Sequence, residues 1–137
     1  MLKKKRLMSL FLIFIFSLIL LPYDAFASKY GICLTNVKYQ QDSNTGKMTK
    51  TEWGIQKVQI DNAYTSLTNP CYDCQFRVKP YKVGVGTLGG VVASMRGGKV
   101  AINSSDGSAE TGTYYLKVAR YDYTLLSSTV DLVWYFQ

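Results

Sequence analysis

The cysteines have the most distinctive chemistry in this sequence. Cys33 stands apart, whereas Cys71 and Cys74 form a C-x-x-C sequence. Because three is an odd number, at most one intramolecular disulfide can form. A bridge from Cys33 would close a loop of about 40 residues and destabilise the unfolded chain by about 4 kcal/mol, whereas a Cys71–Cys74 bridge would contribute about 2 kcal/mol. The longer bridge is worth more, but the sequence alone leaves the pairing open.

Histidine is absent from the 137 residues, and its absence excludes whole classes of site. Ser-His-Asp and Cys-His catalytic pairs need the imidazole as a base. His-ligated zinc and haem sites need it as a ligand. The nine acidic residues are scattered, and no pair suited to hydrolysis by two carboxylates is recognisable. We therefore predict no catalytic residue, no cofactor and no metal site, and a protein that is not an enzyme.

A glycine-rich, uncharged segment at residues 83–95 contains a G-x-G-x-x-G spacing, from Gly84 to Gly89. Dinucleotide binding through this motif requires a helix to begin there, because the pyrophosphate lies at the helix N-terminus. Gly90 and the β-branched pair Val91 and Val92 argue against such a helix. We predict instead two strands joined by a glycine-rich turn, with a membrane-inserting hairpin as the alternative.

The first 27 residues have the pattern of a secretory signal peptide. A basic cluster, Lys3–Arg6, precedes an uncharged run, Leu7–Leu21, and Ala25 and Ala27 occupy the small-residue positions of a cleavage site. The run is shorter than the roughly 20 residues that a membrane span needs. We predict cleavage after Ala27, secretion without a stable membrane span, and a single domain over residues 28–137. Cleavage removes four basic residues and one acidic residue, so the formal net charge falls from +7 to +4.

The remaining chain has the pattern of an all-β protein. Stretches rich in Val, Ile, Tyr and Thr alternate with turn-forming clusters. From Val130 to Phe136 every even-numbered residue is large and apolar, which places these side chains on one face of a strand. About seven short strands predict an antiparallel β-sandwich, with a small barrel as the alternative. The predicted strands are Gly31–Tyr39, Trp53–Asp61, Cys74–Val83, Gly90–Met95, Lys99–Asn103, Thr113–Tyr121 and Thr129–Phe136.

Tyrosine and basic residues are the candidates for a binding surface. Ten of the eleven tyrosines lie after the predicted cleavage site, and a tyrosine ring suits a boundary between protein and water. Strand alternation places Arg77, Lys79 and Tyr81 on one face. Such a face can meet an anionic partner, although a solvated strand face is the alternative interpretation. The predicted contacts are Arg77, Lys79, Tyr81, Tyr121 and Tyr123, and the basic residues do not form a nucleic-acid footprint.

Residues from about 50 to 137 resemble a family of small secreted β-rich proteins of unknown function from Bacillus-type bacteria. The resemblance lies in the blocks Trp53–Ile60, Phe76–Val78 and Gly112–Arg120 and in Trp134. It implies export and β-structure, and it carries over no reaction and no catalytic residue. We expect a secreted protein that binds an extracellular protein or an anionic cell-envelope component. The alternative is a bacteriocin-like membrane-active protein or its exported immunity partner.

Overall fold

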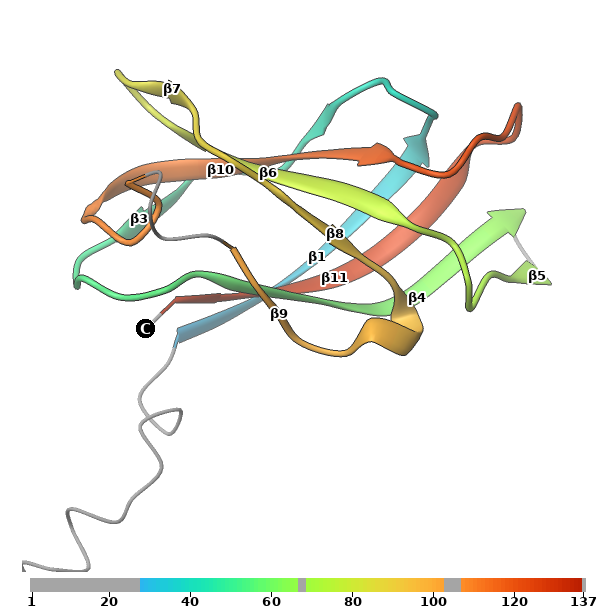
Figure 1. Ribbon diagram of the computed structural model, residues 1–137, viewed down its shortest axis with the longest axis horizontal. Helices are drawn as coiled ribbons and strands as arrows, with labels where there is room; N and C mark the ends of the chain where they lie inside the picture. Colours follow the sequence, from blue (N-terminus) through green and yellow to red (C-terminus); the bar gives the residue numbers. More distant parts are fainter. Residues whose placement is uncertain (1–27, 67–68, 103–106, 137) are drawn as a thin grey trace, which may run out of the picture.

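Two antiparallel sheets pack face to face (Figure 1). The structure, a computed structural model, describes residues 28–66, 69–102 and 107–136. The first sheet has the strand order β1-β11-β4-β5, with β9 also paired to β4. The second has the order β2-β10-β6-β7, with β3 also paired to β10 and β8 to β6. The described strands therefore form a sandwich, as predicted, and not a closed barrel.

Each of the seven predicted strands overlaps a strand of the structure, although their ends differ by a few residues. Asn103, the last residue of one predicted strand, and the predicted signal peptide of residues 1–27 lie outside the described residues. The sequence does not predict the short strands β2, β3, β5 and β7, which lie in segments rich in turn-forming or polar residues. The bounds are β1 Ser28–Val37, β2 Ser43–Asn44, β3 Met48–Lys50, β4 Lys57–Ser66, β5 Asn69–Pro70, β6 Phe76–Lys82, β7 Gly86–Thr87, β8 Val91–Ala93, β9 Val100–Ala101, β10 Gly112–Arg120 and β11 Ser128–Phe136. A 3₁₀ turn, η2 (Met95–Gly97), follows β8.

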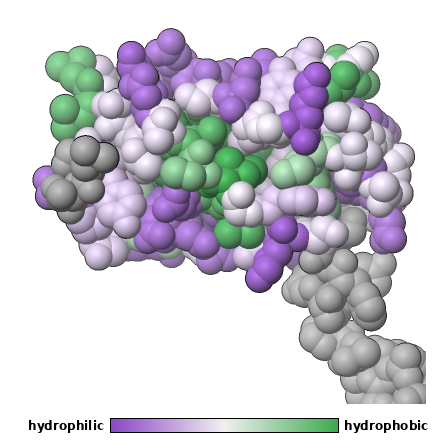
Figure 2. Space-filling model, turned by 180° about the vertical axis from the view of Figure 1, so that it is seen from behind, coloured by the Kyte–Doolittle hydropathy of each residue, from purple (hydrophilic) through white to green (hydrophobic). Residues whose placement is uncertain are grey.

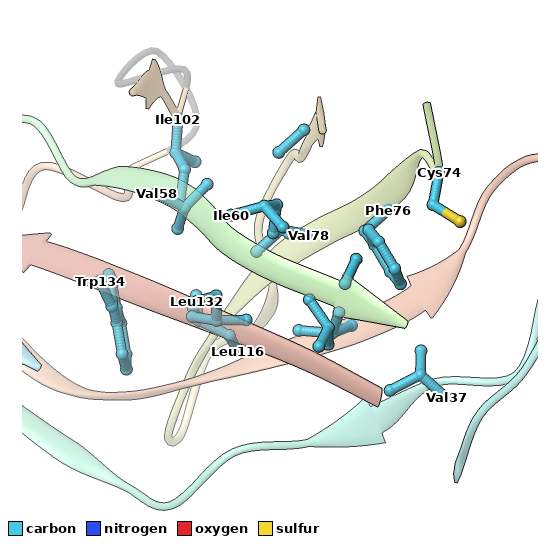
Figure 3. Packing of buried hydrophobic residues seen from close by; sticks show 14 of the residues in the cluster. Val37, Val58, Ile60, Cys74, Phe76, Val78, Ile102, Leu116, Leu132 and Trp134 are labelled. Carbon is cyan, nitrogen blue, oxygen red and sulfur yellow. The ribbon is translucent and has the colours of Figure 1, made fainter. Parts of the chain in front are cut away.

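The hydrophobic core lies between the sheets and follows from the alternation of their central strands. The even-numbered residues of β11 from Val130 to Phe136 are buried, and so are those of β10 from Tyr114 to Val118. Figure 3 shows Leu132 and Leu116 entering the same space from opposite sheets, beside Ile60 of β4. The outward-facing positions of both strands remain available for other contacts.

One buried polar side chain joins the first sheet to the loop before β10. Gln56, which is fully buried, accepts a hydrogen bond from Trp134 Nε1 at 3.0 Å. Its Nε2 donates to the carbonyl of Ser108 at 2.6 Å. The Trp134 N–H and the Gln56 amide are shielded from water. If either lost its hydrogen-bond partner, water could not replace that partner.

The glycine-rich segment at residues 83–95 forms a turn and two short strands, which both pair with β6 at the edge of the second sheet and are not an inner strand pair. Gly84 has φ +85° and Gly86 has φ +125° at the tight turn between β6 and β7. Residues other than glycine rarely adopt these backbone conformations. Gly90 lies against β6, where a Cβ would stand 2.8 Å from Lys79 Cγ. β8 then continues the pairing with β6. The motif therefore occupies the turn between β6 and β7, β7 itself and the two residues after it, and not the start of a helix.

Helices contribute little to the described part of the chain. Within residues 28–66, 69–102 and 107–136, no helix has the length and apolar character needed to cross a bilayer.

Replacing Gln56 with leucine should lower the free energy of unfolding by about 2–4 kcal/mol, because Trp134 Nε1 would stay buried without its acceptor. Urea unfolding followed by tryptophan fluorescence measures the change. The exposed Gln41 provides the control, and Gln41→Leu should change stability by less than about 0.5 kcal/mol. Equal stability of the two variants would contradict the structural role of Gln56.

Candidate functional site

The outer surface of the second sheet brings tyrosine rings and basic side chains together. Arg77, Lys79 and Tyr81 of β6 point outwards, because the residues between them are buried. The register of β6 and β10 sets Lys79 opposite Lys117 and Tyr81 opposite Tyr115. We call these five residues, Arg77, Lys79, Tyr81, Tyr115 and Lys117, the tyrosine–basic face.

The side chains of this face hold one another in place. The Tyr81 and Tyr115 rings are stacked, with centroids 4.6 Å apart and planes 23° apart. Lys117 Nζ lies 4.7 Å from the centroid of the Tyr81 ring, a cation–π geometry. It also donates to Thr87 Oγ1 at 3.2 Å. Lys79 Nζ lies 3.1 Å from Asp42 Oδ2. The result is an ordered aromatic platform with the Lys117 ammonium over the Tyr81 ring.

Tyr121 and Tyr123 lie elsewhere, in the loop between β10 and β11 at one end of the sandwich. The exposed fractions are 50% for Tyr121, 76% for Tyr123, 90% for Leu125 and 61% for Leu126. The Tyr123 ring packs edge-on against Tyr39, with centroids 5.3 Å apart. We call these five residues, Tyr39, Tyr121, Tyr123, Leu125 and Leu126, the tyrosine–leucine tip. The loop stands at the upper right of Figure 1, and the corresponding corner, at the upper left of Figure 2, is hydrophobic.

The predicted contact residues therefore fall into two groups. Arg77, Lys79 and Tyr81 are together on the outer face of the second sheet, whereas Tyr121 and Tyr123 belong to the tip. Sequence reasoning did not select Tyr115 and Lys117, because their proximity to β6 depends on strand pairing. It also missed Tyr39, Leu125 and Leu126. A signal for the two leucines exists, since they form an apolar pair in a segment where no strand was predicted.

A buried arginine fixes the base of the tip. Arg120, the last residue of β10, is 4% exposed. Its Nε and Nη2 each donate to a carboxylate oxygen of Asp122 at 2.6 Å. Its Nη1 donates to Ser128 Oγ at the start of β11, and Nη2 lies 3.8 Å from Cys71 Sγ. Asp122 Oδ1 also accepts a hydrogen bond from the backbone N–H of Gln75 at 2.8 Å. These bonds join both ends of the loop to the segment before β6.

The disulfide links Cys71 and Cys74, whose Cα atoms are 5.4 Å apart. The short Cys71–Cys74 bridge is therefore formed, and not a bridge from Cys33, although the longer loop would restrict the unfolded chain more. Cys33 remains free because it points outwards from β1, whereas Cys74 is buried in the core. A hydrogen bond with Asp131 raises the pKa of the Cys33 thiol, and slight burial and the negative charge of Asp131 act in the same direction.

A cavity of about 250 Å³ lies at the opposite end of the sandwich, where the start of β1 pairs with the end of β11. Lys50 is the buried charge in its wall, and burial lowers the pKa of this lysine. Its Nζ donates to the carbonyls of Glu52 and Ala109, the latter at 2.8 Å. Two backbone acceptors therefore hold the ammonium. The cavity is lined by Ser28, Tyr30, Thr49, Lys50, Thr51, Glu52 and Phe136.

No group of three or more Cys, Asp or Glu side chains suited to a metal ion occurs in the described ranges. Comparison of the chain with protein-family models, curated proteins and solved structures finds no match in any of the three. Function must therefore be inferred from the side chains of the chain itself.

Thiol titration tests the disulfide assignment. The unfolded, unreduced chain should contain one reactive thiol, and Cys33→Ser should contain none. Replacing both Cys71 and Cys74 with serine should lower the free energy of unfolding by about 2 kcal/mol, because the unfolded chain loses a four-residue loop constraint. Cys33→Ser should change stability by less than about 0.5 kcal/mol. A larger loss in Cys33→Ser than in the double variant would overturn the assignment.

Asp122 should make the stability of the fold depend on acid pH. Burial raises the pKa of its carboxyl, but hydrogen bonds from Arg120 and from Gln75 N–H outweigh burial, so the pKa is lowered. The folded state therefore binds fewer protons than the unfolded state, whose Asp titrates near about 3.9. This contribution is complete above that value and is lost as the pH falls through the lower, folded pKa.

Thermal unfolding between pH 2 and pH 7 measures the effect. Asp122→Asn should unfold at a lower temperature than the parent protein at pH 6, and its unfolding temperature should decline less in acid. The matched control is Asp73→Asn, which removes an exposed carboxylate paired with Arg96. Identical profiles for Asp122→Asn and Asp73→Asn would show that Asp122 has no such role.

Proposed function

We propose that this chain is an exported, non-enzymatic β-sandwich that binds a negatively charged extracellular or cell-envelope partner through the tyrosine–basic face. The observation that carries the proposal is the Tyr81–Tyr115 stack with Lys117 over the Tyr81 ring. Stacked rings that are already ordered lose little conformational freedom when a partner binds. Export is proposed on the pattern of residues 1–27.

The charges around this platform favour an anion. Arg77, Lys79 and Lys117 supply three cations, and Asp42, bonded to Lys79, supplies one carboxylate. Clustered charge of one sign raises the local concentration of an oppositely charged ligand. A partner with repeated negative groups, such as an anionic wall polymer, can meet several of these cations at once while its uncharged parts pack on the rings.

The glycine-rich segment at residues 83–95 bears on the alternative function. The positive net charge and this apolar, uncharged segment favour a membrane-active protein or its exported immunity partner as the alternative. In the structure, β7 and β8 are both paired with β6. Insertion of this segment into a membrane would break those pairs, and we therefore favour binding through the tyrosine–basic face.

Charge-neutralising substitutions test the proposal against a matched pair of lysines. Lys79→Gln with Lys117→Gln should weaken binding to purified teichoic acid by about tenfold or more at low salt, because the polymer loses two cationic contacts. Isothermal titration calorimetry measures the affinity. Added salt should weaken binding of the parent protein more than that of the variant.

The control is Lys29→Gln with Lys99→Gln. It makes the same change in net charge, and it removes a comparable cation–π contact, since Lys99 Nζ lies 4.1 Å from the Tyr135 ring centroid. We expect at most a twofold loss of affinity for this pair, because Lys29 lies in β1 and Lys99 directly before β9, both away from the tyrosine–basic face. Equal losses for the two pairs would show that net charge, and not the tyrosine–basic face, governs binding. No binding by the parent protein would refute the anionic-polymer partner.

A further inference from the structure

The tyrosine–leucine tip has a shape and composition that the tyrosine–basic face does not share. Leu125 is 90% exposed, so almost no atom of its own chain covers it. Leu126 is adjacent and 61% exposed, and Tyr121 and Tyr123 of the same loop are also exposed. Contiguous exposed apolar residues on a domain mark a surface that something else covers.

The tip is held in position and is not a loose loop end. Arg120 fixes Asp122 within the loop and Ser128 at its end, and Tyr123 packs against Tyr39 from the segment after β1. The backbone N–H of Tyr121 donates to the carbonyl of Gln75 at 2.8 Å. The two exposed leucines therefore lie on a loop that is already held in place. Little conformational freedom of this loop would be lost when a partner covers them.

The charges near the tip are compatible with an anionic surface. The Asp122 carboxylate is neutralised by Arg120, and that of Asp42 by Lys79. Lys38 is exposed, and its carbonyl accepts a hydrogen bond from the backbone N–H of Arg120, which places this lysine beside the tip. A lysine next to an anionic bilayer favours association.

We propose that the tyrosine–leucine tip docks the protein on the surface of a phospholipid bilayer. A convex pair of leucines can be covered on all sides by a fluid medium, whereas a protein partner would need a complementary pocket. Leucine side chains gain free energy on leaving water, and tyrosine rings favour the headgroup region, where the hydroxyl stays hydrated. The tip holds both residue types, with Leu125 its most exposed side chain and Tyr121 and Tyr123 in the same loop. This inference shares with the proposed function only the export of the chain.

Co-sedimentation with vesicles of equal parts phosphatidylglycerol and phosphatidylcholine tests the proposal on the exported protein. Leu125→Ser with Leu126→Ser should reduce vesicle binding about tenfold or more, because two apolar contacts are lost. The matched control is Val83→Ser with Val85→Ser, which alters two exposed valines at the turn between β6 and β7. This control should bind as the parent protein does.

A second readout locates the contact. Leu125→Trp should show a blue shift of tryptophan emission and quenching by brominated lipid when vesicles are added, and Val85→Trp should show neither beyond the parent protein. The proposal is wrong if the parent protein does not sediment with vesicles, or if both serine variants bind equally well. In that case the tip would fit a protein pocket instead.

The two proposals fail separately. Leu125→Ser with Leu126→Ser should retain the affinity for teichoic acid, whereas Lys79→Gln with Lys117→Gln should retain most of the vesicle binding. Loss of both activities in the leucine variant, with an unchanged unfolding temperature, would overturn the assignment of lipid binding to the tip alone.

Discussion

The alternation of side chains along β10 and β11 is the constraint on which the rest of the structure depends. Each strand lies inside its sheet, β11 between β1 and β4 and β10 between β6 and the short strands β2 and β3. Because neighbouring residues of a strand point to opposite sides, one sequence supplies both the core and an outer surface. Leu116 and Leu132 fill the space between the sheets, while Tyr115 and Lys117 face outwards. A shift of one residue in register would exchange these two sets and destroy both the core and the tyrosine–basic face.

Arg120 is a buried charge at the end of β10, where the chain leaves the sandwich. Burying a guanidinium is costly unless its donors are bonded, and here Asp122, Ser128 and Cys71 lie around it. The same bonds hold the β10–β11 loop to the segment that carries the disulfide. The position of the exposed leucines is therefore set mainly by a polar network at the base of the loop, with the Tyr39–Tyr123 contact as the apolar packing beside it.

The two proposed surfaces differ in their place on the sandwich and in the kind of partner that each would bind. The tyrosine–basic face lies on the flat side of a sheet, where repeated cations can contact a long anionic partner. The tyrosine–leucine tip lies at an end of the sandwich, where a convex apolar group can enter a soft interface. Under the two proposals, one domain would bind a polyanion and a lipid surface through separate residues, so the two partners would not compete.

The sequence by itself determined the fold class, the seven main strands and the absence of imidazole chemistry. These properties depend on local alternation, on turn residues and on residue types, all of which are visible along the chain. It also selected Arg77, Lys79 and Tyr81 as neighbours, because alternation within one strand places them on one face. Only the tertiary structure decided that Tyr115 and Lys117 join them, that Cys74 pairs with Cys71 and not with Cys33, and that Tyr39 meets Tyr123. These contacts depend on strand register and on which side of a sheet each residue faces, and both are settled by packing between segments far apart in the sequence.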